Sequence, residues 1–202
     1  MNNQLKYFFI YKPFGMISQF SPEGCKPVLK DLYNFPSDVY PVGRLDSDSE
    51  GLLIITNDTR LNSRLLSPGN SHRRVYLAQV EGVITNEAIH RLSEGVEISV
   101  EKHIYKTLPA EASLLDNEPI LPERNPPIRF RKSVPVSWLE LSVIEGKNRQ
   151  VRKMTAAVGF PTLRLVRLSI ENLSIQGMSS GSVVEISGDE LYKLLFNSRK
   201  NP

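Results

Sequence analysis

The stretch GRLDSDSEGLLIITND, residues 43–58, poses the first question about fold and function. It places three carboxylates at alternate positions, Asp46, Asp48 and Glu50, just before an apolar run. The run LLIIT, residues 52–56, is short and continuous, which is consistent with a buried strand. Three interpretations of the carboxylates are open: metal ligands, a pair of acid/base groups, or one working aspartate with polar neighbours.

The metal interpretation rests on a partial calcium-loop spacing. The three carboxylates and Gly51 occupy positions one, three, five and six of an EF-hand-like loop. Position twelve, however, falls on Asn57, where the loop needs a glutamate, and a strand-like run follows too early. The cysteine and histidines show no metal-ligand spacing: Cys25, His72, His90 and His103. We therefore expect no metal site.

The other two interpretations differ in what surrounds the carboxylates. A glycosidase sets two carboxyls about 5 Å or more apart across a sugar and raises one pKa by burial. Nothing adjacent offers an apolar pocket, and Trp138 is the only tryptophan available as a sugar platform. A single catalytic aspartate would be Asp46, because the nearby Gly43 permits close approach of a ligand. Taken alone, however, one aspartate in one turn is better explained as an ordinary turn residue.

Length and composition indicate the broad class of protein. At 202 residues with 40% hydrophobic residues, the chain suits one compact domain, residues 1–202, with two subdomains. No run of about 18 apolar residues is present, so we expect no membrane span. The N-terminal sequence reads as a strand rather than a signal peptide. We therefore expect a cytoplasmic protein.

The pattern of apolar residues predicts an α+β fold. Expected strands cover residues 6–13, 52–56, 73–82, 137–146, 162–170 and 181–187. Expected helices begin after Asn57 or Asp58, after Thr85, after Asn148 as N-cap, and near Asp189. The proline-rich segment 114–135 is predicted to be a long ordered loop. Without regular βαβ alternation, the sheet should be mixed and mostly antiparallel.

Positive charge is concentrated in one part of the chain. Residues 124–167 hold ten Lys/Arg and two acidic residues, a net charge of +8, whereas the remaining residues sum to −5. A basic block on a nearly neutral protein indicates a face that binds a polyanion. Charge alone would still favour an ordinary solvated surface.

Several motifs, taken together in their order along the chain, favour the interpretation with one catalytic aspartate. The stretch at residues 43–58, together with YKPFGMISQFS (11–21), VYLAQVEG (75–82) and the long segment beginning RNPPIRF (124–170), resembles the RsuA/RluB/RluE family of ribosomal RNA pseudouridine synthases. The likeness spans about residues 7–186 and is strongest to the RluE branch, which acts on the large subunit. It implies the pseudouridine synthase fold: a mixed, mostly antiparallel sheet with flanking helices, and two lobes around an active-site cleft.

The resemblance assigns roles to particular positions. Asp46 would be the catalytic nucleophile, which either attacks the sugar or base covalently or assists glycal formation by removing a sugar proton. Tyr76 would stack on the flipped uracil. Arg152 would pair with Asp46 and orient it, and Arg44 would border the site, entering the gap that the flipped base leaves. By itself, Tyr76 would read as a core tyrosine and Arg152 as a surface charge. Asp48 and Glu50 become loop residues whose loss should matter little.

The resemblance also bears on the wall of the base pocket, on one turn and on the N-terminal part of the chain. Leu168 or Ile170 would wall the base pocket, with Leu168 taken as the candidate. The chain departs from the family pattern at Glu171 and Thr59, where glycine is common, which leaves the turn at Glu171 in question. The catalytic domain would start by residue 7, so we expect no N-terminal S4-type RNA-binding domain.

The implied activity is isomerisation of a specific uridine in 23S-type ribosomal RNA by a cofactor-free monomer. A paired uridine must first leave its stack, and an aromatic face compensates for the lost stacking. The basic block would contact the RNA backbone and make affinity salt-dependent. The proposed RNA contacts are Arg124, Arg129, Arg131, Lys132, Lys147, Arg149 and Lys153. A non-catalytic rRNA-binding or ribosome-assembly factor is the alternative.

Overall fold

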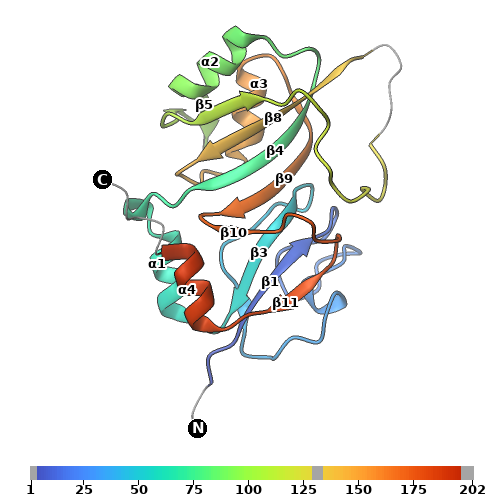
Figure 1. Cartoon of the computed structure of the whole chain (residues 1–202), viewed down its shortest axis with the longest axis vertical. Helices are drawn as coiled ribbons and strands as arrows, with labels where there is room; N and C mark the ends of the chain where they lie inside the picture. The colour runs from blue at the N-terminus through green and yellow to red at the C-terminus, as the bar shows by residue number, and fades with distance from the viewer. Residues whose placement is uncertain (1–3, 129–133, 197–202) are drawn as a thin grey trace.

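A nine-stranded mixed sheet runs through the whole elongated molecule (Figure 1). The computed structural model describes residues 4–128 and 134–196. The main strand path is β11-β1-β3-β9-β4-β8-β7, with β2 and β10 alongside β3 and β9. These strands are β1 (Tyr7–Lys12), β2 (Tyr40–Pro41), β3 (Glu50–Thr56), β4 (Arg74–Glu81), β7 (Glu111–Leu114), β8 (Val136–Val143), β9 (Thr162–Ile170), β10 (Leu173–Ser174) and β11 (Val183–Glu185).

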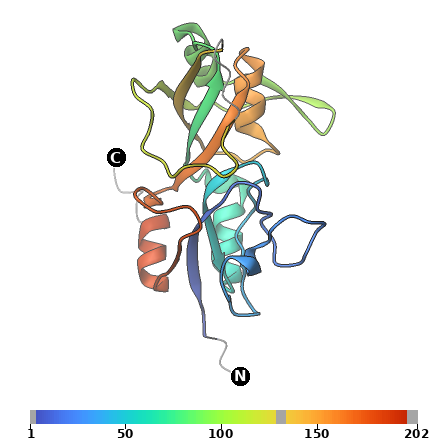
Figure 2. The ribbon, with the colours of Figure 1, turned by 90° about the vertical axis from the view of Figure 1, so that its right-hand side faces the viewer.

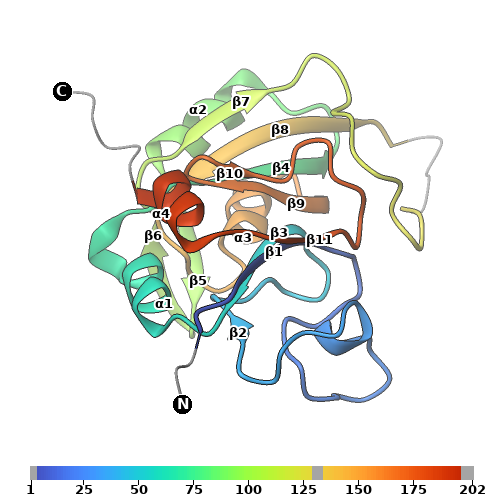
Figure 3. The same cartoon turned by 60° about the horizontal axis from the view of Figure 1, so that its bottom comes forward.

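Four α-helices within the described residues flank this sheet, and Figure 3 shows them beside its strands. They are α1 (Thr59–Leu66), α2 (Asn86–Glu94), α3 (Gln150–Ala157) and α4 (Gly188–Phe196). Short 3₁₀ turns lie at Leu29–Asp31 and Pro68–Asn70, and a separate hairpin joins β5 (Glu97–Val100) to β6 (His103–Lys106). The expected α+β class with a mixed, mostly antiparallel sheet is therefore confirmed.

The sheet divides into two halves that meet between β3 and β9. The first half holds β1, β3 and β11 with α1 and α4; the second holds β4, β8 and β9 with α2 and α3 (Figure 1). The two strands at the junction are parallel, with only Glu50 opposite Val166 and Gly51 opposite Arg167 in register. Gly51 has φ +108°, and a Cβ there would lie 2.3 Å from the Arg167 carbonyl oxygen. The junction therefore requires glycine at residue 51.

Strand β3 is buried on both faces, which explains its unbroken apolar run. Leu52 and Ile54 join a core with α1 and α4, while Leu53 and Ile55 pack against the loop segments between β1 and β2. A further core in the second half packs α2 and α3 on β4 and β8, as shown by the buried set Ala78, Val80, Leu92, Leu139 and Met154. Tyr76, which is partly buried, packs against the same core.

The residues that cap the helices can be compared with those that the sequence predicts. Asp58 caps α1, accepting hydrogen bonds from Arg60 N (2.9 Å) and Leu61 N (3.1 Å), and Thr85 caps α2. Asn148 as cap of α3 was wrong. Helix α3 starts at Gln150, and the residue before it, Arg149, has a left-handed backbone with φ +54°. This conformation turns the chain between Asn148 and the helix.

Two further predictions need correction. Glu50 is not a loop residue but the buried first residue of β3. Several short strands were also missed: β2, β5, β6, β7 and β10. The irregular segment 115–128 is confirmed as lacking helix and strand, and it runs along the second half to the junction with the first half (Figure 2). Within the described ranges, no helix is long and apolar enough to cross a membrane.

Candidate active site

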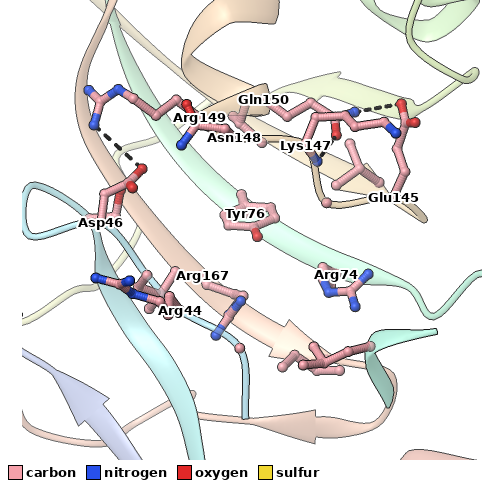
Figure 4. A pocket seen from close by; sticks show the side chains of 18 of the residues that line it. Arg44, Asp46, Arg74, Tyr76, Glu145, Lys147, Asn148, Arg149, Gln150 and Arg167 are labelled. Carbon is pink, nitrogen blue, oxygen red and sulfur yellow. Dashed lines mark hydrogen bonds and ion pairs between the residues drawn. The ribbon is translucent and has the colours of Figure 1, made fainter. Parts of the chain in front are cut away.

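A pocket of about 960 Å³ lies where the two halves meet. Its walls come from the loop after β2, from β4, from the loop between β8 and α3, and from β9 (Figure 4). Asp46, Tyr76 and Arg149 all border it. Side chains about 100 residues apart in sequence thus converge on one space.

The loop that carries Asp46 is fixed from both sides. The Ser18 hydroxyl donates to Leu45 O (2.7 Å) and accepts from Leu45 N (3.1 Å). The Gly15 amide donates to Ser47 O (2.7 Å), and the Ser49 amide closes a turn on Asp46 O (3.0 Å). Asp46 is therefore presented from an anchored turn rather than from a free loop.

A buried lysine supports this turn from beneath. The Lys12 ammonium is fully buried and donates to Pro13 O (2.9 Å) and Met16 O (2.8 Å), which holds the segment that contacts the Asp46 loop. Burial lowers the pKa of Lys12 to about 7, although the negative charges of Glu50, Asp48 and Asp46 oppose the shift.

Arg149 rather than Arg152 reaches Asp46. The Arg149 Nη1 atom lies 3.4 Å from Asp46 Oδ2 (Figure 4). The same guanidinium donates two hydrogen bonds to Asp48, at 3.0 and 2.7 Å. Arg152 lies against Asp48 instead, with Nε 3.4 Å from Oδ2 and Nη2 bonded to the Asp48 carbonyl. The predicted pairing of Arg152 with Asp46 is therefore corrected: Arg152 lies one step away, behind Asp48.

Asp48 is therefore the carboxylate that both arginines of this cluster contact. Burial acts to raise the pKa of its carboxyl, but the hydrogen bonds from Arg149 and the charge of Arg152 outweigh burial and bring the pKa below its ordinary value. Asp48 stays ionised and fixes the Arg149 guanidinium beside Asp46.

Of the remaining residues predicted at the pocket, Tyr76 and Arg44 line it and Leu168 does not. Tyr76 is half-buried on β4, and Figure 4 shows its ring between Arg149 and the row Arg44–Arg167–Arg74. Arg44 is exposed and lines the pocket, as expected of a residue that borders the site. Leu168 does not line it: its side chain packs on the core of the first half, and Ile170 is at the pocket instead.

The predicted RNA contacts are only partly at this site. Lys147 and Arg149 line the pocket, whereas Lys153 lies on α3 outside it. Arg124 packs its guanidinium over the Phe14 ring at 4.1 Å and donates to Pro126 O. Arg129, Arg131 and Lys132 lie outside the described residues.

Other pocket residues escaped the sequence prediction. Arg74 and Arg167 line the pocket from neighbouring strands β4 and β9. Glu145 accepts hydrogen bonds from Gln150 Nε2 (2.7 Å) and Tyr105 OH (2.6 Å), which ties the loop before α3 to the β5–β6 hairpin. Arg167 belongs to the predicted basic block of residues 124–167, but no sequence signal pointed to Arg74 or Glu145 as pocket residues.

The third carboxylate of the opening stretch has no part in the pocket. Glu50 is 1% exposed and accepts two hydrogen bonds of 2.9 Å from Arg164 Nε and Nη2. In the part of the chain that the structure describes, His, Cys, Asp and Glu side chains form no group that could hold a metal ion.

Comparisons with known proteins agree on one family. The family model described as RNA pseudouridylate synthase matches residues 6–157. Proteins named ribosomal large subunit pseudouridine synthase E are 43% identical over 182 residues in Vibrio vulnificus (90% of this chain, 75% of the relative) and 46% identical over 170 residues in Xanthomonas axonopodis pv. citri (83% and 87%). Ribosomal large subunit pseudouridine synthase B of Bacillus subtilis is 33% identical over 189 residues, covering 93% of this chain and 70% of that protein.

Solved structures show the same fold. A crystal structure described as a pseudouridylate synthase superposes with a TM-score of 0.76 at 24% identity, covering 95% of this chain and 74% of that one. Human RNA pseudouridylate synthase domain containing 1 gives a TM-score of 0.54 at 15% identity, with coverage of 98% and 92%. These likenesses extend to the overall architecture.

Proposed function

The chain belongs to the RNA pseudouridylate synthase family, and we propose that it isomerises one uridine to pseudouridine in large-subunit ribosomal RNA. Relatives at 43% and 46% identity carry a large-subunit name, which supports this substrate. One observation carries the proposal of the site: Asp46 lies in a pocket with Tyr76 and within 3.4 Å of Arg149.

The reaction needs a nucleophile and a place for the base. The bond from N1 of uracil to C1′ of the ribose breaks, and C1′ then joins C5 of the same base. The hydrogen on C5 leaves as a proton, and N1 gains one, so every atom and electron is conserved without a cofactor. We assign Asp46 as the nucleophile because its carboxylate lies at the pocket on an anchored turn.

Tyr76 is placed to receive the extruded base. Taking a uridine out of its stack costs a few kcal/mol. Stacking on an aromatic ring returns about 1–3 kcal/mol per base. In this proposal, the half-buried Tyr76 ring supplies that face, and Arg44 borders the base at the exposed rim of the pocket. Ile170, rather than Leu168, completes the wall.

Arg149 and Asp48 hold the nucleophile in place. The Arg149 guanidinium lies between the two carboxylates, so its bidentate bond to Asp48 sets its approach to Asp46. A geometry fixed before substrate arrives lowers the barrier by positioning rather than by new contacts. Arg152 holds Asp48 from the other side.

The test replaces the nucleophile. We expect Asp46→Asn to leave the target uridine unmodified when rRNA from cells that depend on the variant is mapped for pseudouridine. Asp116→Asn, an exposed aspartate in the segment after β7, is the matched control and should modify normally. Normal modification by Asp46→Asn would overturn the assignment. A wild-type protein that binds rRNA but produces no pseudouridine would favour the assembly-factor alternative.

Two further properties follow as proposals. We propose a monomer, because the described walls of the pocket come from the two halves of one chain. We also propose the cytoplasm as its compartment, since the substrate is ribosomal RNA. A molecular mass of 22.8 kDa in sedimentation would support the first.

A further inference from the structure

Three arginines line one side of the pocket in a row, and we call them the arginine face: Arg44, Arg167 and Arg74. Arg44 comes from the loop after β2, Arg167 from β9, and Arg74 from β4. Figure 4 shows them below Tyr76, with Arg44 near Asp46 and Arg74 at the far end. The sequence prediction included only Arg44 among them.

These arginines differ from the others near the junction because they lack acidic partners. Arg164 is paired with Glu50, and Arg149 with Asp48. Among the described residues, no carboxylate lies within ion-pair distance of the arginine face. Arg74 donates only to the carbonyls of His72 and Leu65, each at 3.1 Å, and Arg167 Nε donates to Leu52 O at 2.8 Å.

The arrangement is electrostatically costly without an anion. Arg167 is only 5% exposed, and within the described structure its Nη2 atom has no hydrogen-bond acceptor. Burial lowers the pKa of Arg74, and the charge of Arg167 adds to this shift, while Tyr76 and Glu171 oppose it. Arg167 is thus a buried cation without a counter-charge beside the partly buried Arg74, and a buried charge that lacks a partner is costly.

We propose that the arginine face binds a phosphodiester group of the RNA beside the flipped nucleotide. A guanidinium presents paired N–H donors that match phosphate oxygens, and partial burial strengthens each contact. Base and phosphate belong to one nucleotide, and the Tyr76 ring and the arginine face border one pocket. This inference rests on the proposed function, since Tyr76 must hold the base for the neighbouring phosphate to reach the arginines.

A salt titration of binding tests the proposal independently of catalysis. The probe is a synthetic stem-loop of large-subunit rRNA, selected because it binds to the wild-type protein. Each phosphate contact contributes about 0.7–0.9 to the slope of log affinity against log salt. Because both arginines share one phosphate in this proposal, we expect Arg44→Gln and Arg74→Gln each to lower the slope by part of that amount. Each should weaken binding about tenfold. Arg91→Gln, exposed on α2 away from the pocket, should change neither.

Arg44 keeps the test decisive if Arg74→Gln fails to fold. The Arg44 side chain is exposed and, among the described residues, makes no hydrogen bond or ion pair that its loss would break, so Arg44→Gln should fold. Slopes of Arg44→Gln and of any folded Arg74 variant equal to the wild-type slope would overturn the proposal. Arg74→Lys, which keeps the charge, should retain the slope.

Neutral RNA linkages locate the contact. Methylphosphonate is introduced at one linkage at a time around each unpaired uridine of the stem-loop. We expect one position to weaken wild-type binding while adding no further loss to Arg74→Gln. Losses that add at every position would overturn the site. Pseudouridine formation together with variant slopes equal to the wild-type slope would overturn the phosphate site alone. Reduced variant slopes and non-additive losses without any pseudouridine would overturn the proposed function alone.

Discussion

The three carboxylates of the opening stretch occupy three different environments. Asp46 faces the pocket, Asp48 is bound by two arginines, and Glu50 is buried in a strand. From their spacing in sequence, the three carboxylates could be metal ligands, could include an acid/base pair, or could be one catalytic aspartate with two polar neighbours. The partners that distinguish them lie 101–114 residues away, which no local pattern reveals.

Loss of the Asp48 charge should slow the reaction. Asp48→Asn removes the bidentate acceptor of Arg149, so the guanidinium beside Asp46 is no longer held. We expect single-turnover pseudouridine formation to fall about tenfold to a hundredfold, because small misplacements of reacting groups cost this much. RNA binding should change little.

Asp48→Glu is the informative partner of that variant, since it keeps the charge on a longer stem. Partial recovery of the rate with Asp48→Glu is expected. If the Asp48→Asn enzyme is as fast as the wild type, Asp48 does not position Arg149 for the reaction, and the minor role predicted from the sequence is correct.

The buried Lys12 should make stability depend on pH. Its folded pKa is about 7, against 10.5 in an unfolded chain. Between these values the unfolded chain binds more protons, so the free energy of unfolding rises with pH, by at most about 1.4 kcal/mol per unit. Below pH 7 both states are protonated and the full cost of burial remains.

Denaturant melts from pH 7 to 9.5 measure this effect. The difference in free energy of unfolding between wild type and Lys12→Met should rise across that interval. The exposed Lys30→Met should run parallel to the wild type throughout. A Lys12→Met curve that is also parallel would show that Lys12 does not titrate there.

At the scale of elements, the buried Glu50–Arg164 pair links β3, β9 and the segment 115–128. Arg164 donates to Glu50 at 2.9 Å and also to Pro122 O at 2.7 Å. Glu50→Gln leaves the Arg164 charge without its counter-charge in a buried place. We expect a loss of about 3–5 kcal/mol in the free energy of unfolding.

The double variant Glu50→Met with Arg164→Met separates charge from packing. It removes both charges, so it should be more stable than Glu50→Gln when the two are compared by urea denaturation. Equal destabilisation would assign the effect to lost packing and hydrogen bonds.

Sequence patterns predicted those elements whose signals are strong and local. The apolar run of β3 and the caps of α1 and α2 are examples, because burial and capping leave clear residue choices. Strands β5, β6 and β7 were missed because they are short and largely exposed. The start of α3 was misplaced because arginine gives no sign of the left-handed conformation that Arg149 adopts. Glu171 takes the same conformation, with φ +47°, where the family pattern has glycine.

At the scale of the molecule, the two halves are joined by a short strand pairing and by a core that packs Leu52 and Ile54 with Leu77, Val166 and Ile170. Parallel pairing between β3 and β9 covers two residue pairs, and Gly51 lies against the Arg167 backbone. Gly51→Ala would place a methyl group 2.3 Å from the Arg167 carbonyl oxygen. We expect a loss of about 3–5 kcal/mol in the free energy of unfolding, the range of large single-residue effects.

Gly69→Ala is the matched control, since a Cβ at residue 69 meets no atom within 4 Å. Thermal and urea melts of the two alanine variants should therefore differ widely. A Gly51→Ala protein as stable as Gly69→Ala would mean that the halves are joined mainly by other contacts.

Arg167 belongs to this junction and to the pocket at once. Its backbone pairs with Gly51, its Nε holds Leu52 O, and its guanidinium lines the pocket. Natural selection for a stable chain and selection for substrate recognition therefore act on the same side chain. Replacing this arginine would therefore remove the Nε bond to Leu52 O and a cation of the pocket together, while its backbone pairing with Gly51 would stay.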